Sequence, residues 1–116
     1  MESTPHEIIL SKRAKQDVED ISLYIEHRDS LYAAEQFKVD FVIEVEKNLK
    51  NFPEVHKQYE AIPQVHYFVF KKNYLIFHST RGNNVYVITV RHGAKDQNKG
   101  FTKSLARLKR EALRSG

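Results

Sequence analysis

The chain has 116 residues, enough to bury one hydrophobic core but too few for two, so we expect a single domain over residues 1–116. Cysteine is absent, which excludes disulfides, thiol catalysis and thiolate metal sites and agrees with a reducing compartment. No apolar run approaches the ~20 residues that span a bilayer, and the polar N-terminus is unlike a signal peptide. These features predict a cytoplasmic protein without a membrane partner.

The net charge of +4 is divided unevenly along the chain. Residues 1–63 hold 8 Lys and Arg against 13 Asp and Glu, whereas residues 64–116 hold 11 against 2. Clustered positive charge attracts polyanions, so the C-terminal half indicates nucleic acid or an acidic protein as the partner, with a merely solvated basic surface as the alternative.

The first half of the chain predicts a strand followed by two helices. Residues 6–10 are apolar and β-branched, which is typical of a short strand, and Ser11 can cap a helix over residues 11–28. Apolar residues then recur at helical spacing, first at Ala14, Val18, Ile21 and Ile25, and after a second cap at Ser30 at Ala34, Phe37, Phe41, Val45 and Leu49. The second helix should end before Pro53, and so short a turn predicts an antiparallel helical hairpin.

The second half predicts three strands and a helix. An irregular segment at residues 54–63 precedes aromatic and β-branched runs at residues 65–70, 74–78 and 85–90, which predict an antiparallel meander. Residues 101–115 are predicted to form a basic amphipathic helix with Phe101, Leu105, Leu108 and Ala112 on one face. The predicted class is α+β, with a β-α-α-β-β-β core over about residues 6–97, an antiparallel sheet packed on the hairpin, and a C-terminal basic helix.

An assumed strand register, with turns at Lys72-Asn73 and around Gly82, divides the sheet into two faces. One face is apolar and suits the hairpin; it carries Phe68, Phe70, Leu75, Phe77, Val85 and Val87. The other face carries Tyr67, Val69, Lys71, Tyr74, Ile76, His78, Tyr86, Ile88, Val90 and His92, with Tyr67, His78 and Tyr86 in one cross-strand row. Alternation sends Arg91 and His92 to opposite faces.

Two hypotheses explain the second face. In the first, the C-terminal helix or a partner covers its aliphatic centre, while tyrosines and histidines remain at the rim. In the second, it is a shallow RNA site where bases stack on tyrosines, Lys and Arg hold phosphate, and His78 and His92 transfer protons.

Other site types have little support. Neither helix carries a His-x-x-x-His or Glu-x-x-His pair, so we expect no metal, and phosphate-binding glycine loops and serine-nucleophile motifs are missing from the sequence. No cofactor is expected. Lys12 and Arg13 open the first helix, where cations oppose the helix dipole, and this suggests anion contact, with solvation as the alternative.

Four segments together resemble the RelE/ParE superfamily of bacterial toxins. They are IILSKRAKQDVEDISLYI at residues 8–25, NFPEV at 51–55, YFVFKKNYLIFH at 67–78 and VRHGAKD at 90–96. The resemblance covers about residues 7–97. It implies a β-α-α-β-β-β fold with a curved antiparallel sheet, and the toxin of a type II toxin–antitoxin module, of the ParE-like or plasmid-stabilisation branch, that a small cognate antitoxin neutralises.

The superfamily divides by target. RelE-like members cut mRNA on the ribosome with basic residues on the second to fourth strands and a C-terminal tyrosine, whereas ParE-like members poison DNA gyrase. This chain has His66, Phe68 and Leu75 at positions where the nucleases are basic, and only Lys95 keeps a basic identity. The resemblance therefore favours a ParE-like growth inhibitor acting on gyrase or another non-nuclease target. The alternatives are a RelE-like, metal-independent mRNA endoribonuclease and a non-toxic binding module.

Candidate site residues follow from these alternatives. For a nuclease, His92 would transfer the proton with support from His78. Nucleic-acid or partner contacts would come from Lys71, Lys72, Arg81, Arg91, Lys95, Tyr67, Tyr86, Arg107, Lys109 and Arg110. An antitoxin tail would lay its apolar side chains on the exposed sheet face and its carboxylates against the basic half. A homo-oligomer is expected to be possible without the antitoxin.

Overall fold

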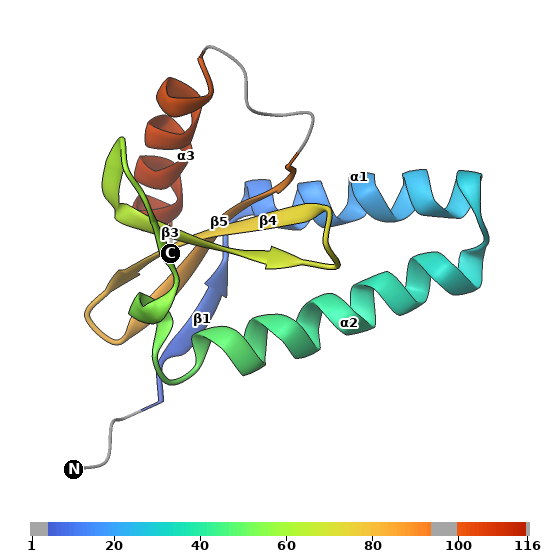
Figure 1. Cartoon of the computed structure of the whole chain (residues 1–116), viewed down its shortest axis with the longest axis horizontal. Coiled ribbons are helices and arrows are strands. Elements are labelled where there is room, and N and C mark those ends of the chain that lie inside the picture. The colour runs from blue at the N-terminus through green and yellow to red at the C-terminus, as the bar shows by residue number, and fades with distance from the viewer. Residues whose placement is uncertain (1–4, 94–99, 116) are drawn as a thin grey trace.

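The computed structural model describes residues 5–93 and 100–115, and its elements follow the predicted order (Figure 1). They are β1 (Glu7–Leu10), α1 (Lys12–Arg28), α2 (Leu31–Leu49), the 3-10 helix η1 (Pro53–Val55), β2 (Lys57–Tyr59), β3 (Ile62–Phe70), β4 (Tyr74–Arg81), β5 (Asn84–His92) and α3 (Phe101–Ser115). The α+β class is confirmed. The segment expected to be irregular contains η1 and β2, which sequence patterns of this length do not reveal.

Both helices of the hairpin begin where a serine can cap them. The Ser11 hydroxyl accepts a hydrogen bond from the Ala14 amide at 3.0 Å, and the Ser30 hydroxyl accepts one from the Ala33 amide at 3.0 Å. Each bond satisfies an amide that has no partner within its helix. The predicted helix starts are therefore confirmed.

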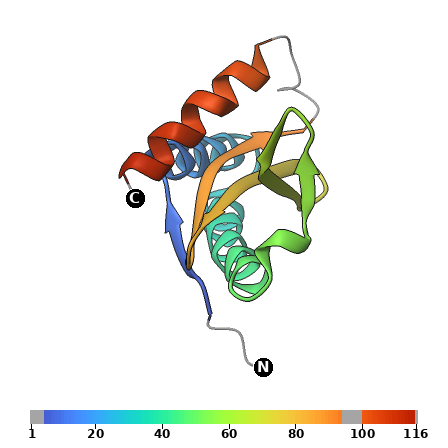
Figure 2. The same cartoon turned by 90° about the vertical axis from the view of Figure 1, so that its left-hand side faces the viewer.

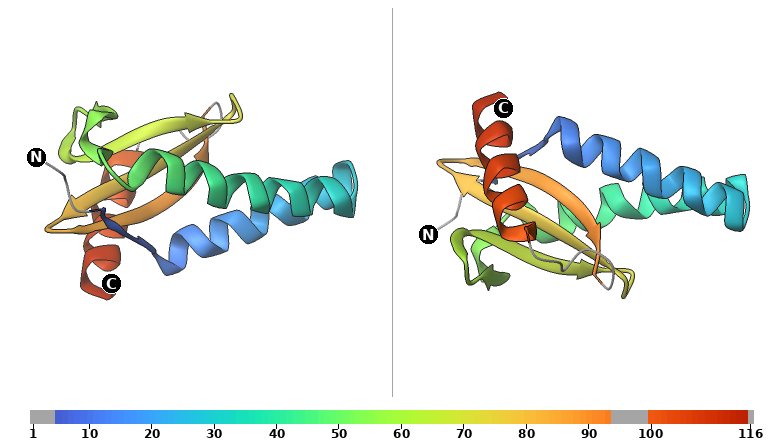
Figure 3. Two further views of the ribbon diagram at one scale, coloured as in Figure 1. Left: turned by 90° about the horizontal axis from the view of Figure 1, so that it is seen from below. Right: turned by 90° about the horizontal axis from the view of Figure 1, so that it is seen from above.

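The five strands form one sheet in the order β1-β5-β4-β3-β2. Neighbouring strands are antiparallel except β1 and β5, which are parallel, so the predicted antiparallel sheet holds for β2 to β5. Figure 2 shows the twisted sheet between α3 and the helical hairpin, and Figure 3 shows that the hairpin extends well beyond the strands.

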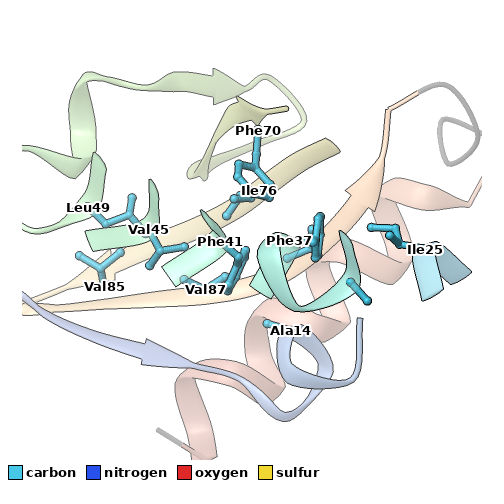
Figure 4. Close-up of a cluster of buried hydrophobic side chains, with 12 residues drawn as sticks. Ala14, Ile25, Phe37, Phe41, Val45, Leu49, Phe70, Ile76, Val85 and Val87 are labelled. Carbon is cyan, nitrogen blue, oxygen red and sulfur yellow. The ribbon is translucent and has the colours of Figure 1, made fainter. Parts of the chain in front are cut away.

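Each face of the sheet has its own hydrophobic cluster. The hairpin-side cluster joins both hairpin helices to the sheet and contains Ala14, Ile25, Ala34, Phe37, Phe41, Val45, Leu49, Phe70, Ile76, Val85, Val87 and Val90 (Figure 4). The α3-side cluster contains Ile62, Val65, Phe77, Tyr86, Ile88, Phe101, Leu105, Leu108 and Ala112. Each side of the sheet therefore has helices packed on it, and the part of the first hypothesis in which the C-terminal helix covers the face opposite the hairpin is confirmed. The expected rim of tyrosines and histidines is wrong, because Tyr86 is buried beneath α3 and His78 pairs with Val87 of the hairpin side.

The assumed register was wrong on both hairpins. Tyr67 lies opposite Phe77, His78 opposite Val87, and Tyr86 opposite Ser79, so the predicted row of Tyr67, His78 and Tyr86 does not form. Leu75 and Phe77, which were expected to face the hairpin, belong to the α3 side, while Tyr74, Ile76 and Val90 pack on the hairpin side.

The register changes within the β4–β5 pair because β5 carries an extra residue. Phe77 pairs with Thr89 and His78 with Val87, which leaves Ile88 as a β-bulge. The β3–β4 loop is also one residue longer than the assumed turn at Lys72-Asn73. Phe70 pairs with Tyr74, so the loop comprises Lys71, Lys72 and Asn73. A single inserted residue reverses which face every later side chain meets.

Ser11, the N-cap residue of α1, and Asp17 within α1 bind the backbone of β5 where β1 ends. The Ser11 amide donates to the Val87 carbonyl at 3.1 Å, and the Ser11 hydroxyl donates to the Ile88 carbonyl at 2.8 Å. Further along, the buried Asp17 carboxylate accepts a hydrogen bond from the Val90 amide at 3.0 Å and another from the Thr89 hydroxyl. The start of α1 thus takes over the hydrogen bonding that a longer β1 would have supplied.

No helix in the described part of the chain is long and apolar enough to cross a membrane.

Replacing Asp17 should destabilise the fold strongly. Its carboxylate also pairs with Arg13 at 3.0 Å, so Asp17→Ala leaves the Thr89 hydroxyl and the Val90 amide buried without an acceptor. We expect a loss of about 3 kcal/mol in the free energy of unfolding, measured by urea denaturation. Asp20→Ala, on the exposed side of the same helix, is the control and should change it by less than about 0.5 kcal/mol. Equal effects would contradict a specific role for Asp17.

Candidate functional site

His78, predicted as a catalytic residue, lies in the interior. It is on the central strand β4 with 0% of its surface exposed. Its Nε2 lies 2.9 Å from Nδ1 of His56, so one of the two nitrogens must carry the proton of that hydrogen bond. His66 stacks beside it with the ring centroids 5.9 Å apart, and Phe68 lies 6.0 Å away. His78 is thus part of a histidine cluster, formed by His56, His66 and His78, that joins the end of η1 to the sheet.

Burial keeps the centre of this cluster uncharged at neutral pH. Desolvation, followed by the effects of the nearby His56 and His66, lowers the pKa of His78 to about 3. Burial also lowers the pKa of His56, followed by the effect of His66. A neutral imidazole sealed from solvent cannot exchange protons with a substrate, so His78 is a packing residue.

His92 and Arg91 occupy opposite sides of β5, as predicted. His92 packs edge-on against Tyr74 with ring centroids 5.6 Å apart, on the hairpin side. Arg91 donates from Nε to the Thr89 hydroxyl at 3.1 Å and places its guanidinium 5.7 Å from the centre of the Phe101 ring, on the α3 side. Thr89 itself binds Asp17, so the orientation of Arg91 depends on the anchoring of α1.

The two histidines do not form an acid–base pair. His92 lies opposite Tyr74 and His78 lies four positions further along β4, which corresponds to about 13 Å along a strand. The expectation that His92 shares an open face with Tyr86 is also wrong, because Tyr86 is buried beneath α3.

The predicted tyrosines are packing residues. Tyr67 is half-buried, with its ring centroid 5.4 Å from that of Phe77, and Tyr86 is a buried member of the α3-side cluster. Tyr67 still lines a hollow with Tyr59 of β2, whereas Tyr86 is covered by α3. The predicted row of tyrosines on one open face, on which RNA bases would stack, therefore does not form.

The predicted cations fall into separate groups. Lys71 and Lys72 form the β3–β4 turn with left-handed φ values of 51° and 66°, and the Lys71 ammonium binds the Asp40 carboxylate of α2 at 2.7 Å. That hydrogen bond lowers the pKa of Asp40. Arg81 is exposed at the end of β4, whereas Lys95 lies outside the described residues. Lys71 is therefore already paired, and Lys71 and Lys72 lie at the opposite end of β4 from Arg81, so these three cations do not converge on one catalytic point.

The remaining predicted cations are on α3. Arg107 and Arg110 are exposed and Lys109 is half-buried. Arg107 and Arg110 lie on the outer side of the helix, away from the sheet that its apolar side covers, and Lys109 lies at the flank. In this helix the structure brings predicted binding residues together.

An apolar surface on α2 was missed by the sequence reasoning. Val39, Val42 and Ile43, the α2 apolar patch, are each more than half exposed. Val42 also lines a groove of about 270 Å³ between α2 and the edge strand β1, together with Ile8, Leu10, Phe41 and Val45. The sequence could have indicated this surface, because these three apolar residues fall outside the buried stripe of the same helix.

Solved structures and family models agree on the class of this fold. The structure matches a chain of the "Chromosomal ParDE TA system from P. aeruginosa" with a TM-score of 0.69 and 12% sequence identity, over 78% of this chain and 98% of that chain. This likeness identifies the architecture. Comparison with curated protein sequences gives no match.

The family is shown by the sequence itself. Residues 8–97 match the model of the ParE toxin of the type II toxin–antitoxin system parDE. This chain therefore belongs to the ParE toxin family, as the resemblance implied. The matched residues end before α3 begins.

Acidification should destabilise the protein through the histidine cluster. The unfolded state binds a proton near pH 6.5, whereas folded His78 resists protonation down to about pH 3. Its contribution to stability is therefore complete above pH 6.5 and declines as the pH falls towards 3, by up to about 1.4 kcal/mol per unit. His78→Leu should flatten this part of a urea-denaturation pH profile relative to the wild type. The exposed His27→Leu variant is the control, and parallel profiles for wild type and His78→Leu would contradict the assignment.

Proposed function

We propose that this ParE-family toxin inhibits growth by poisoning DNA gyrase and does not act as an mRNA endonuclease. The observation that carries the proposal is the covering of the sheet face by α3, with His78 sealed on the other side of the sheet. Metal-free RNA cleavage needs a base, an acid and cations around one phosphate. The described strands offer no such convergence.

The family resemblance supplies the target. ParE-like members act on gyrase, and the chain departs from the nuclease pattern at His66, Phe68 and Leu75. In the structure these side chains serve packing: His66 stacks on His78, and Leu75 contributes to the α3-side cluster. Their positions are compatible with a toxin that acts by binding.

The gyrase proposal is tested by comparing two purified systems. The protein should inhibit gyrase supercoiling and stabilise cleaved DNA, and it should leave mRNA intact on programmed ribosomes. His92→Ala should retain inhibition within about twofold, since this ring contacts Tyr74 and has no catalytic role. Unaffected supercoiling, or cleaved message that disappears with His92→Ala, would overturn the proposal in favour of the nuclease.

The second part of the proposal is an antitoxin partner that binds the hairpin side. The matching ParDE structure is titled as a toxin–antitoxin system, which supports a cognate antitoxin here. The predicted docking place, the open sheet face, is occupied by α3. Exposed apolar residues are found instead on the α2 apolar patch and along the adjoining groove. Contiguous apolar surface marks protein interfaces.

The edge of β1 adds hydrogen-bonding capacity to this surface. Glu7 donates its amide to Asn83, just before β5, and Ser11 donates its amide to Val87 of β5. By alternation, the amides and carbonyls of Ile8 and Leu10 point to the open edge. Their side chains line the groove beside Val42. An extended antitoxin segment could add a strand here and place alternate aliphatic side chains in the groove.

A charge placed in the α2 apolar patch should disrupt antitoxin binding. Val42→Asp buries an unpaired carboxylate in the complex, and we expect at least a tenfold increase in Kd, measured by calorimetry with the cognate antitoxin. Val69→Asp is the matched control because Val69 has the same exposed fraction, 57%, but lies on β3. Similar affinities for both variants would place the antitoxin elsewhere.

A further inference from the structure

The outer side of α3 carries a continuous row of cations. Lys103, Arg107, Arg110 and Arg114, the α3 basic stripe, are all exposed and recur at intervals of four, three and four residues. The buried residues Phe101, Leu105, Leu108 and Ala112 follow the same spacing on the side that faces the sheet. The stripe therefore lies on the solvent side of the helix, and in the right-hand view of Figure 3 no other element lies in front of α3.

The start of α1 extends this positive surface. Lys12 and Arg13 line a hollow together with Arg114 and Glu111 from the last turns of α3. The helix α3 has five basic residues and one acidic residue, Glu111. Glu111 lies beside the stripe, with its carboxylate 3.9 Å from Arg107. Arg13 is held by Asp17, whereas Lys12 is exposed. Positive charge therefore predominates from one end of α3 to the adjoining α1.

The composition of this surface indicates what kind of partner it fits. Among the described residues, the large hydrophobic side chains that are exposed lie on α1, α2, β3 and the segment between residues 50 and 55, and none lies on α3. Protein interfaces have an apolar centre from which charged residues are depleted, whereas nucleic-acid interfaces are polar and strongly positive. The α3 basic stripe has the second composition.

Two other polyanionic partners fit less well. Insertion of α3 into a lipid surface would require its apolar side, which is already buried on the sheet. Single-stranded nucleic acid is held by aromatic platforms on which bases stack, and the described part of α3 presents no exposed aromatic ring. The remaining fit is a duplex, whose bases are already stacked on one another.

We propose that the α3 basic stripe binds the phosphate backbone of a nucleic-acid duplex without reading its sequence. From Lys103 to Arg114 the helix rises about 16 Å, a length along which B-DNA carries roughly ten phosphate charges. Arginine, at three of the four positions, binds phosphate through paired N–H groups. Because α3 follows the residues that match the family model, this surface is an addition to the matched domain.

The test uses the full-length protein, fluorescence anisotropy and labelled random-sequence duplexes. Four phosphate contacts predict that log K falls with log salt with a slope of about −3.6, between about 50 and 200 mM salt. The triple variant Arg107→Gln/Arg110→Gln/Arg114→Gln should reduce this slope by about 2.7, because three contacts are lost. The variant Arg107→Lys/Arg110→Lys/Arg114→Lys keeps the three positive charges and should retain most of the wild-type slope.

A control with the same net charge separates the stripe from bulk electrostatics. Lys47→Gln/Lys50→Gln/Lys57→Gln also removes three exposed cations, but from α2, the residue after it and β2, and should leave the slope within about 0.5 of the wild type. Circular dichroism should show that all variants fold. Equal losses in the two glutamine triples would overturn the proposal.

Competing ligands decide the class of partner. Duplex DNA and duplex RNA of equal length are compared as competitors, because both present a phosphate backbone. Preferential binding of either duplex supports the proposal. Tighter binding of single strands, or of polyglutamate at matched charge, would overturn it. The measurement involves no gyrase, so failure of the gyrase proposal and failure of duplex binding are seen separately.

Discussion

The anchoring of α1 on β5 is the interaction on which both faces of the sheet depend. β5 continues beyond the end of β1, and the buried backbone groups of Ile88 and Val90 there would be unsatisfied without Ser11 and Asp17. Buried backbone amides need partners, so the Asp17 carboxylate replaces a strand at this point. The bulge at Ile88 lies within the same stretch. By changing the alternation of β5, it turns Arg91 towards α3 and His92 towards the hairpin.

This arrangement gives the molecule two outer surfaces of opposite chemistry. The hairpin side exposes aliphatic residues of α2 beside an open strand edge, and it belongs to the acidic half of the sequence. The α3 side exposes cations and belongs to the basic half. Because the sheet separates them, a protein bound on the hairpin side and a polyanion bound on α3 need not compete for the same atoms. Growth inhibition and neutralisation could therefore use different surfaces of one small domain.

Helices and strands were predictable because their periodicities and caps are local. Ser11, Ser30 and Pro53 mark helix boundaries through contacts within a few residues, and the apolar stripe of α3 correctly indicated a covering helix. The register was not predictable, because the bulge is at Ile88, inside an apolar run without a glycine or other residue that would signal it. The partnership of His56 with His78 joins residues 22 positions apart, one of them in a segment without apparent pattern. Asp17 was visible only as part of a family resemblance, because a buried carboxylate on a helix looks like any surface acid until β5 is placed beside it.

The fate of the histidines follows from burial. A row of histidines and tyrosines on one strand face suggests proton transfer, but catalysis requires a group that stays accessible and titrates near neutral pH. His78 is surrounded by His56, His66 and Phe68, and the low pKa that this burial imposes makes it a neutral, shape-filling ring. The same residue types at the surface would have supported the opposite conclusion. In this chain the strand exit at Arg91 and His92 contributes packing on both sides of β5, and a continuous row of exposed cations lies on α3 instead.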